Sequence, residues 1–187
     1  LRLVSQGDGR WNWIAGAFYN HFTLDSSSAE FVPGYPEFIG LPADTPTLEY
    51  LELNDETLEE KALFGELGYL LTDRWQVTVG ARWFEFDDDL ETQFALPLLE
   101  PVPGEVNLAG NRNKTQDDDF IFKFNTSYRF TDDVMGYLTI SEGYRQGGIN
   151  SGPACENPLP PGQNVCLLPD EVLISPDTTV NYELGLR

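Results

Sequence analysis

Two segments of the chain alternate apolar and polar residues with a period of two over about a dozen positions. In 75–86 the odd positions are Trp75, Val77, Val79, Ala81 and Trp83, and in 119–130 the even positions are Phe120, Phe122, Phe124, Thr126, Tyr128 and Phe130. Successive side chains of an extended strand point to opposite faces, so each segment predicts a strand with one apolar face. A helix is disfavoured because the period is wrong and β-branched and aromatic residues are frequent.

Further segments carry weaker versions of the same pattern. Residues 58–71 and 134–145 alternate less regularly, 11–22 is the least clear, and the end of the chain alternates Val180, Tyr182, Leu184 and Leu186 against polar residues. Leu1–Val4 is typical of the tail of one more strand. We therefore expect about six strands plus a strand remnant.

The connections between these segments differ greatly in length. Three stretches, 24–56, 87–116 and 146–174, hold 12 of the 13 prolines and 17 of the 31 acidic residues, with Arg112 and Lys114 as their only basic residues. Proline removes a backbone donor, so we expect these stretches to be long loops. The other links, at 6–9, 72–74 and 131–133, consist of turn-forming residues. The pattern predicts an antiparallel meander with tight turns at one end and long loops at the other.

Two all-β architectures fit this meander. A soluble sandwich usually has strands of about 5–6 residues and short loops, whereas these segments run for about 10–14 residues, close to the length of a tilted transmembrane strand. Trp75 and Trp83, at the two ends of one apolar face, fit the aromatic girdles of an outer-membrane barrel. Length and loop asymmetry together favour a transmembrane β-barrel with short periplasmic turns and long extracellular loops.

Several motifs resemble a known family. Ala62–Leu67, Leu71–Trp75 and Val79–Arg82 resemble a strand–turn–strand unit of TonB-dependent outer-membrane receptors. Ser141–Gly148 is similar to the strand of that family that ends in a Gly-Gly loop start, and Pro176–Thr178 with Asn181–Arg187 to the strand after it. Trp13–Tyr19 matches an earlier barrel strand more loosely. The order and spacing of the motifs carry the resemblance.

The resemblance implies a 22-stranded barrel with a separate plug domain, which takes up scarce large solutes such as ferric siderophores with energy from the TonB complex. Residues 1–187 then form a partial β-barrel domain of a larger receptor, about a third of the wall, without the plug domain and ending at Arg187 rather than at an aromatic residue. Such a fragment is too short to close a wide barrel or to transport alone.

The two cysteines, Cys155 and Cys166, lie in the third long loop. An even pair in an oxidising compartment predicts a disulfide bond. A metal or redox pair is the alternative, but the spacing is not Cys-x-x-Cys and no histidine is near.

Two acidic runs flank the second long loop: Asp87, Asp88 and Asp89 before it, and Asp117, Asp118 and Asp119 after it. Antiparallel pairing is expected to bring these carboxylates together at the extracellular rim, as a site for a hard cation such as Ca²⁺, and a divalent ion held there would also bridge the rim to lipopolysaccharide phosphates. A solvated acidic rim is the simpler interpretation, because the calcium-loop pattern is missing.

A second set of charged residues falls on the polar faces of the strands. We expect Glu66, Arg82, Lys123, Arg145 and Glu183 to face the lumen or the plug domain, with a ladder of ion pairs as the default. The single histidine, His21, is interpreted as an ordinary rim residue.

The sequence has no catalytic signature: it lacks a serine nucleophile elbow, a histidine-based metal spacing and a phosphate-binding glycine loop. We expect no enzyme activity, no cofactor and no metal centre. A net charge of −20 argues against nucleic acid as a partner. The expected partners are outer-membrane lipid and lipopolysaccharide, the receptor's own plug domain and through it the TonB complex, and a large solute.

The expected location is the outer membrane of a Gram-negative cell. A passive porin-like barrel and a soluble extracellular β-sheet binding module are the alternatives. The acidic loops favour a neutral or cationic solute, since they repel anions at long range.

Overall fold

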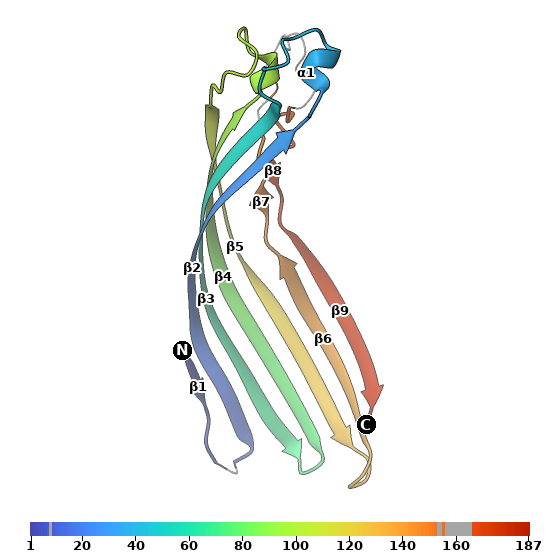
Figure 1. Ribbon diagram of the computed structural model, residues 1–187. Coiled ribbons are helices and arrows are strands. Elements are labelled where there is room, and N and C mark those ends of the chain that lie inside the picture. Colours follow the sequence, from blue (N-terminus) through green and yellow to red (C-terminus); the bar gives the residue numbers. More distant parts are fainter. Residues whose placement is uncertain (8, 153–154, 156–165) are drawn as a thin grey trace.

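The computed structural model describes residues 1–7, 9–152, 155 and 166–187. They form one open antiparallel sheet in the order β1-β2-β3-β4-β5-β6-β9, and a two-stranded ribbon of β7 and β8. The strands are β1 (Arg2–Val4), β2 (Trp11–Phe31), β3 (Leu48–Thr72), β4 (Trp75–Ala95), β5 (Ala109–Arg129), β6 (Met135–Arg145), β7 (Gly148–Ile149), β8 (Leu173–Ile174) and β9 (Asp177–Leu186). Figure 1 shows a tilted, curved meander. The predicted all-β fragment of six strands and a remnant is confirmed.

Tight turns close one end of the meander, as predicted. Strand β3 ends at Thr72 and β4 begins at Trp75. The turn from β5 to β6 is closed by the Phe130 N–H, which donates to the Val134 carbonyl oxygen at 2.9 Å. The β1–β2 connection contains residue 8, which lies outside the described residues.

The outer face of the sheet carries an apolar belt. The register aligns side chains of β2, β3, β4 and β5 in four successive rows: Trp11–Tyr69–Val77–Thr126, Trp13–Leu67–Val79–Phe124, Ala15–Gly65–Ala81–Phe122 and Ala17–Leu63–Trp83–Phe120. None of these residues is charged. The four rows span seven residues of β2 and β3, and with Trp75 and Tyr128 the belt spans nine residues of β4 and β5, which matches the roughly 9–11 residues that a tilted strand needs to cross a bilayer.

The composition of both faces changes at the end of this belt. The next outer row is Tyr19–Lys61–Glu85–Asp118, and each of the three rows beyond it contains at least two charged residues. On the opposite, inner face of β4, Phe84, Phe86 and Leu90 are buried. The apolar residues of β4 therefore move from the odd to the even positions at Trp83–Phe84. The outer face passes from lipid to water at that point, while the pleat continues unchanged.

The strands are consequently longer than predicted. Strands β2 to β5 run for 21, 25, 21 and 21 residues, so the segments 24–31, 48–56, 87–95 and 109–118 belong to the sheet and not to loops. At about 3.3 Å per residue, 21 residues extend for roughly 70 Å, more than twice the hydrocarbon thickness. The upper halves of these strands therefore project beyond the membrane belt.

Two short helical turns cap the extended end. Helix α1 (Tyr35–Phe38) follows Gly34, whose φ of 81° suits glycine, and the 3₁₀ turn η1 is Pro97–Leu99. The two loops pack together, because a Cβ on Gly104 would lie 2.6 Å from Pro46. Within the described residues, no helix is long and apolar enough to span a membrane.

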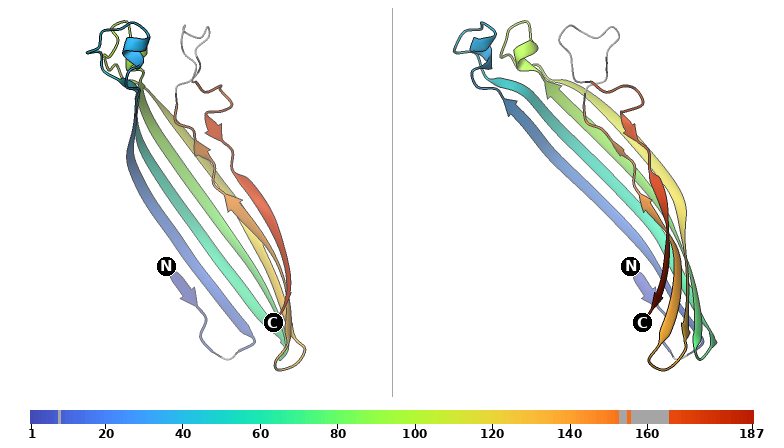
Figure 2. Two further views of the ribbon diagram at one scale, coloured as in Figure 1. Left: turned by 45° about the vertical axis from the view of Figure 1, so that its right-hand side comes forward. Right: turned by 90° about the vertical axis from the view of Figure 1, so that its right-hand side faces the viewer.

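The third long connection folds back onto the sheet. Strand β6 pairs with β5 only as far as Ser141, opposite Lys123, and β7 then contacts β4 and β5. Figure 2 shows the β7–β8 ribbon beside the upper halves of these strands. The Tyr144 ring lies over Phe84, with 3.8 Å between the ring centroids. This segment, residues 144–152, is called the return segment below, and it explains why apolar side chains are buried on the inner face.

Replacing Phe84 with alanine is expected to detach the return segment. The lost packing amounts to about 3–5 kcal/mol, a typical cost for a buried phenylalanine. Hydrogen exchange of residues 144–152 in the membrane-embedded protein should rise strongly. Phe122→Ala, on the lipid-facing side and 56% exposed in the isolated chain, is the matched control and should leave this exchange unchanged. Equal exchange in both variants would contradict the packing.

Candidate functional site

The inner face of the strand extensions forms a polar wall with an acidic character. We define this inner wall by the inward positions of β3, β4 and β5 from the row of Phe84 upward. Its acidic members are Glu52, Glu56, Glu60, Asp88, Asp117 and Asp119. Arg112 and Lys114 occupy outer positions on β5. Within the described residues, the wall itself contains no basic side chain.

The lower border of the inner wall carries the nearest cation. Arg82 Nη2 lies 2.7 Å from Glu60 Oε1, and the Arg82 guanidinium lies 5.7 Å from the centroid of the Phe18 ring. In the next inner row below Arg82, Lys123 Nζ lies 3.0 Å from Glu66 Oε1. Both cations are therefore engaged with carboxylates, and neither forms an ion pair with the remaining acidic side chains of the wall.

The return segment is attached to the wall by polar contacts as well as by Tyr144. Asn111 Nδ2 donates to the Gly152 carbonyl oxygen at 3.3 Å, and the Ser151 side chain hydrogen-bonds to Glu52. Burial opposes the ionisation of Glu52, but hydrogen bonds from Tyr50, Asn54 and Ser151 outweigh it and lower the pKa of this carboxyl. Glu52 is thus an ionised anchor for the return segment.

Asp88 is the most unusual member of the wall. It is 4% exposed, and its Oδ1 atom has no hydrogen-bond partner among the described residues. Burial raises the pKa of Asp88 to about 6, and the nearby carboxylates of Glu56, Asp89 and Asp87 add to the shift. A buried carboxyl with this pKa changes charge between mildly acidic and neutral pH.

The hydroxyl of Tyr144 is also buried without a partner in the described structure. Burial raises the pKa of this phenol, and the carboxylates of Asp117 and Glu60 raise it further. Tyr144 therefore stays a neutral donor at physiological pH. The wall and the return segment together present carboxylate acceptors around an aromatic surface, a combination suited to a ligand with hydrogen-bond donors or positive charge.

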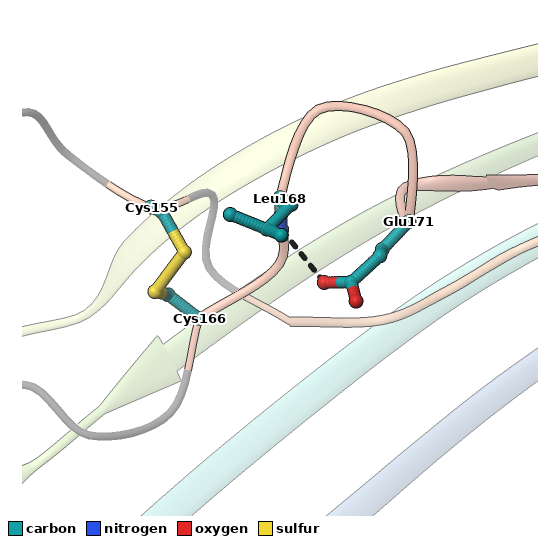
Figure 3. The surroundings of a disulfide bond; sticks show 4 residues. All are labelled: Cys155, Cys166, Leu168 and Glu171. Atoms are coloured by element: carbon teal, nitrogen blue, oxygen red, sulfur yellow. Dashed lines mark hydrogen bonds between the residues drawn. A yellow bond between two sulfur atoms is a disulfide. The ribbon is translucent and has the colours of Figure 1, made fainter.

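The two cysteines form a disulfide bond. Cys155 and Cys166 are joined with an S–S distance of 2.03 Å and a Cα–Cα distance of 4.8 Å, as Figure 3 shows. The Cys155 N–H donates to the Leu167 carbonyl oxygen at 2.9 Å, and the Leu168 N–H donates to Glu171 Oε2 at 2.9 Å. The intervening residues 156–165 lie outside the described residues.

The two acidic runs lie within strands β4 and β5 and not at the ends of a loop, so the predicted gathering of six carboxylates is wrong. Alternation divides them: Asp87, Asp89 and Asp118 face outward, and Asp88, Asp117 and Asp119 face inward. On the outer face, Lys114 Nζ lies 2.8 Å from Asp87 Oδ1, and Arg112 binds Asp89 with two hydrogen bonds of 2.7 and 2.8 Å. Across the described ranges, no group of three acidic, histidine or cysteine residues is placed to hold a metal ion.

The other singled-out residues make local pairs. Glu183 accepts a 2.6 Å hydrogen bond from the Tyr137 hydroxyl. Arg145 pairs with Asp177 at 2.7 Å between β6 and β9, where both side chains are exposed. His21 Nδ1 lies 3.3 Å from Glu59 Oε1 on the outer face. The structure thus separates Arg145 and Glu183 from the group of Glu66, Arg82 and Lys123.

Comparison with known proteins agrees with this architecture. Residues 2–187 match the family model described as "TonB dependent receptor-like, beta-barrel". The chain belongs to this receptor family. Pesticin receptors from Yersinia enterocolitica and Yersinia pestis are 26% identical over 188 residues, which is 100% of this chain and 23% of each receptor.

A solved structure shows the same fold. The ferric yersiniabactin uptake receptor FyuA from Yersinia pestis superposes with a TM-score of 0.74 at 20% identity, over 100% of this chain and 24% of that one. The chain therefore spans about a quarter of the length of the relatives that it matches. The relatives are named as receptors, and the one with a solved structure is named as an uptake receptor.

Sequence analysis of this receptor barrel missed the inner wall of the extensions. Asp88 was included only as one of three consecutive carboxylates, and Tyr144 and Ser151 were not singled out. The signal was the change of phase at Trp83-Phe84-Glu85-Phe86. Beyond it, alternation continues with apolar residues on the other face, which indicates a strand that leaves lipid and is covered from inside.

Acidification is expected to tighten the return segment against the inner wall. When the segment opens, the pKa of Asp88 returns to its ordinary value near 3.9, so the closed state binds the proton more tightly. The stabilisation is complete below about pH 4 and is lost as the pH rises through about 6. This linkage is on the order of 3 kcal/mol.

Hydrogen exchange of residues 144–152, corrected for the intrinsic pH dependence, measures this effect between pH 4.5 and 7.5. Asp88→Asn should abolish the pH dependence and keep the segment closed at pH 7.5. Glu85→Gln, three residues away on the outer face and not among the carboxylates that raise this pKa, should behave like the wild type. A pH dependence that survives in Asp88→Asn would contradict the assignment.

Proposed function

We propose that the chain forms part of the barrel wall of an outer-membrane receptor that actively takes up a bulky solute. The parent receptor would include a plug domain and draw energy from the TonB complex through it. The single observation that carries the proposal is the family match over residues 2–187. The uncharged outer belt and the charged inner positions Glu66, Arg82 and Lys123 give it physical support.

The parts of the wall have different roles in this proposal. The nine-residue belt between Trp75 and Trp83 contacts lipid. The ion pairs below the inner wall, Arg82–Glu60 and Lys123–Glu66, face the plug domain. The inner wall and the return segment, above the lipid, contact the solute before it passes the plug domain.

The charge of the inner wall favours a neutral or cationic solute rich in hydrogen-bond donors. Carboxylates on the wall attract positive charge, and the low-dielectric surface beside Tyr144 strengthens that attraction. An anionic complex would meet uncompensated repulsion, because the nearest cations, Arg82 and Lys123, are paired. The ligands of the relatives do not decide the charge of this solute, because that charge is argued from this chain's own inner-wall residues.

Uptake by the parent receptor in whole cells tests the function. We expect accumulation of a suitable ferric complex that stops when a protonophore collapses the proton gradient, because TonB-dependent uptake needs energy. Accumulation that continues without the gradient would contradict active uptake and indicate a passive pore. Loss of uptake after deletion of the plug domain's TonB-contact segment would support the energy route independently.

The charge of the solute is tested with complexes of net positive, zero and negative charge. The double variant Glu56→Gln with Asp117→Asn should weaken binding of the cationic complex about tenfold, since it removes two inner-wall charges. Glu85→Gln, on the outer face, is the matched control and should bind normally. Tightest binding of the anionic complex by the wild type would contradict the solute class and leave the uptake function intact.

A further inference from the structure

An apolar groove lies on the outer face at the end with the tight turns. It has a volume of about 570 Å³ and is lined by side chains of β4, β5, β6 and β9 together with Phe130. The lowest outer row of the belt reads Trp75–Tyr128–Gly136–Leu186. Gly136 is the floor of the groove, since every neighbour in that row carries a large side chain.

The absence of a side chain at Gly136 keeps the groove open. A Cβ at this position would lie 2.9 Å from the Phe130 ring and 3.4 Å from the Leu186 side chain. Aromatic rings of Trp75, Tyr128 and Phe130 form one bank, and Leu184 with Leu186 forms the other. A side chain larger than hydrogen would therefore occupy the space between the two banks.

The aromatic bank is held in place by hydrogen bonds. Trp75 Nε1 donates to Thr126 Oγ1 at 2.8 Å, and the Thr126 hydroxyl donates to the Gln76 carbonyl oxygen at 3.1 Å. The Tyr128 and Phe130 rings pack edge to face with 5.1 Å between centroids. The groove is thus a preformed cavity within the roughly 300–1,000 Å³ typical of ligand sites.

A cation stands at the turn end of the groove. Arg74 Nη1 donates to the carbonyl oxygen of Phe130 at 3.4 Å, and Phe130 lines the groove. This contact places the exposed guanidinium beside the end of the apolar bank, just beyond the belt. Arginine binds phosphate oxygens with charge-assisted hydrogen bonds.

We propose that this groove binds one glycerophospholipid, with an acyl chain along the groove between the aromatic and the leucine banks and the phosphate on Arg74. The proposal rests on the proposed function for its membrane orientation: tight turns face the periplasm, so the groove opens to the leaflet of glycerophospholipids. The apolar groove with Arg74 at its end matches the order of chains and phosphate in such a lipid. Lipopolysaccharide, whose leaflet lies at the opposite end of the belt, is excluded as the occupant.

Native mass spectrometry of the detergent-solubilised parent receptor tests the proposal. The probe is palmitoyl-oleoyl phosphatidylethanolamine, titrated alone and in competition with lipid A. We expect one tightly retained phospholipid on the wild type. Gly136→Leu should reduce its retention at least fivefold by filling the groove, and Arg74→Gln should weaken it about tenfold by removing the phosphate contact.

Gly65→Leu is the matched control. Gly65 lies on the same outer face, and a Cβ there meets only the Ile14 carbonyl oxygen at an ordinary 3.5 Å, so retention should equal that of the wild type. Equal retention by all variants, or equal competition by lipid A, would overturn the proposal. A receptor dimer in place of the lipid-bound monomer would also overturn it.

The lipid readout is independent of uptake. If the wild type retains the phospholipid and fails to accumulate any solute, the proposed function fails while the groove assignment stands. If uptake is normal and Gly136→Leu and Arg74→Gln retain the lipid like the wild type, the groove assignment fails alone. Far-UV circular dichroism of each variant verifies that the strands are formed, and Arg74→Gln, at an exposed turn, preserves the test if Gly136→Leu does not fold.

Discussion

The backbone hydrogen bonding of the strands is the constraint on which the rest of this structure depends. Inside a bilayer every N–H and C=O must find a partner within the protein, so a strand that enters lipid stays paired on both sides until it leaves. Strands β2 to β5 keep one register from the row of Val77 upward to well beyond the belt, and the β3–β4 register shifts only at Leu70/Thr72, next to the tight turn. Because the pleat is continuous, each strand has two independent surfaces, and each surface is free to change composition where its surroundings change.

That freedom accounts for the features of the receptor wall. Below Trp83 the outer surface is apolar because it meets lipid, and the inner surface is polar because it meets the lumen. Above Phe84 the outer surface meets water and becomes charged, while the inner surface is covered by the return segment. The buried carboxyl of Asp88 lies in this covered region, so one sheet joins a lipid-facing belt to an inner wall that contains a buried carboxyl.

Much of the fold was predictable from the sequence, because period-two alternation depends only on backbone geometry. The ends of β6 and β9 and the tight turn at 72–74 were predicted closely. So was the division of the belt strands into an apolar and a polar face, but the ends of β2 to β5 away from the tight turns were not predicted closely. The whole of 24–56 and 87–116 was interpreted as loop because of its prolines, although 24–31, 48–56, 87–95 and 109–116 contain none and belong to strands.

Proline was the better guide to the true loops. Pro33 to Pro46 and Pro97 to Pro103 fall between the observed strands, in 32–47 and 96–108, and the described extensions contain none. Proline removes a backbone hydrogen-bond donor, whereas a carboxylate only makes one face of a strand polar. Proline therefore indicates where strand pairing stops, and a carboxylate does not. The phase change at Trp83–Phe84 indicates that the inner face is covered, but it does not indicate by which segment, since the approach of the return segment depends on Tyr144 and Ser151 far along the chain.

A nitroxide scan of the outer face of β4 tests most directly whether the lipid belt ends at Trp83 while the strand continues. Single labels at Val79, Ala81, Glu85, Asp87 and Glu91 of the membrane-reconstituted parent receptor would be compared by their accessibility to oxygen and to a water-soluble nickel chelate. The account predicts lipid exposure at 79 and 81, water exposure from 85 onward, and strand-like mobility throughout. Lipid exposure at 87 and 91, or loop-like mobility from 87 onward, would contradict it.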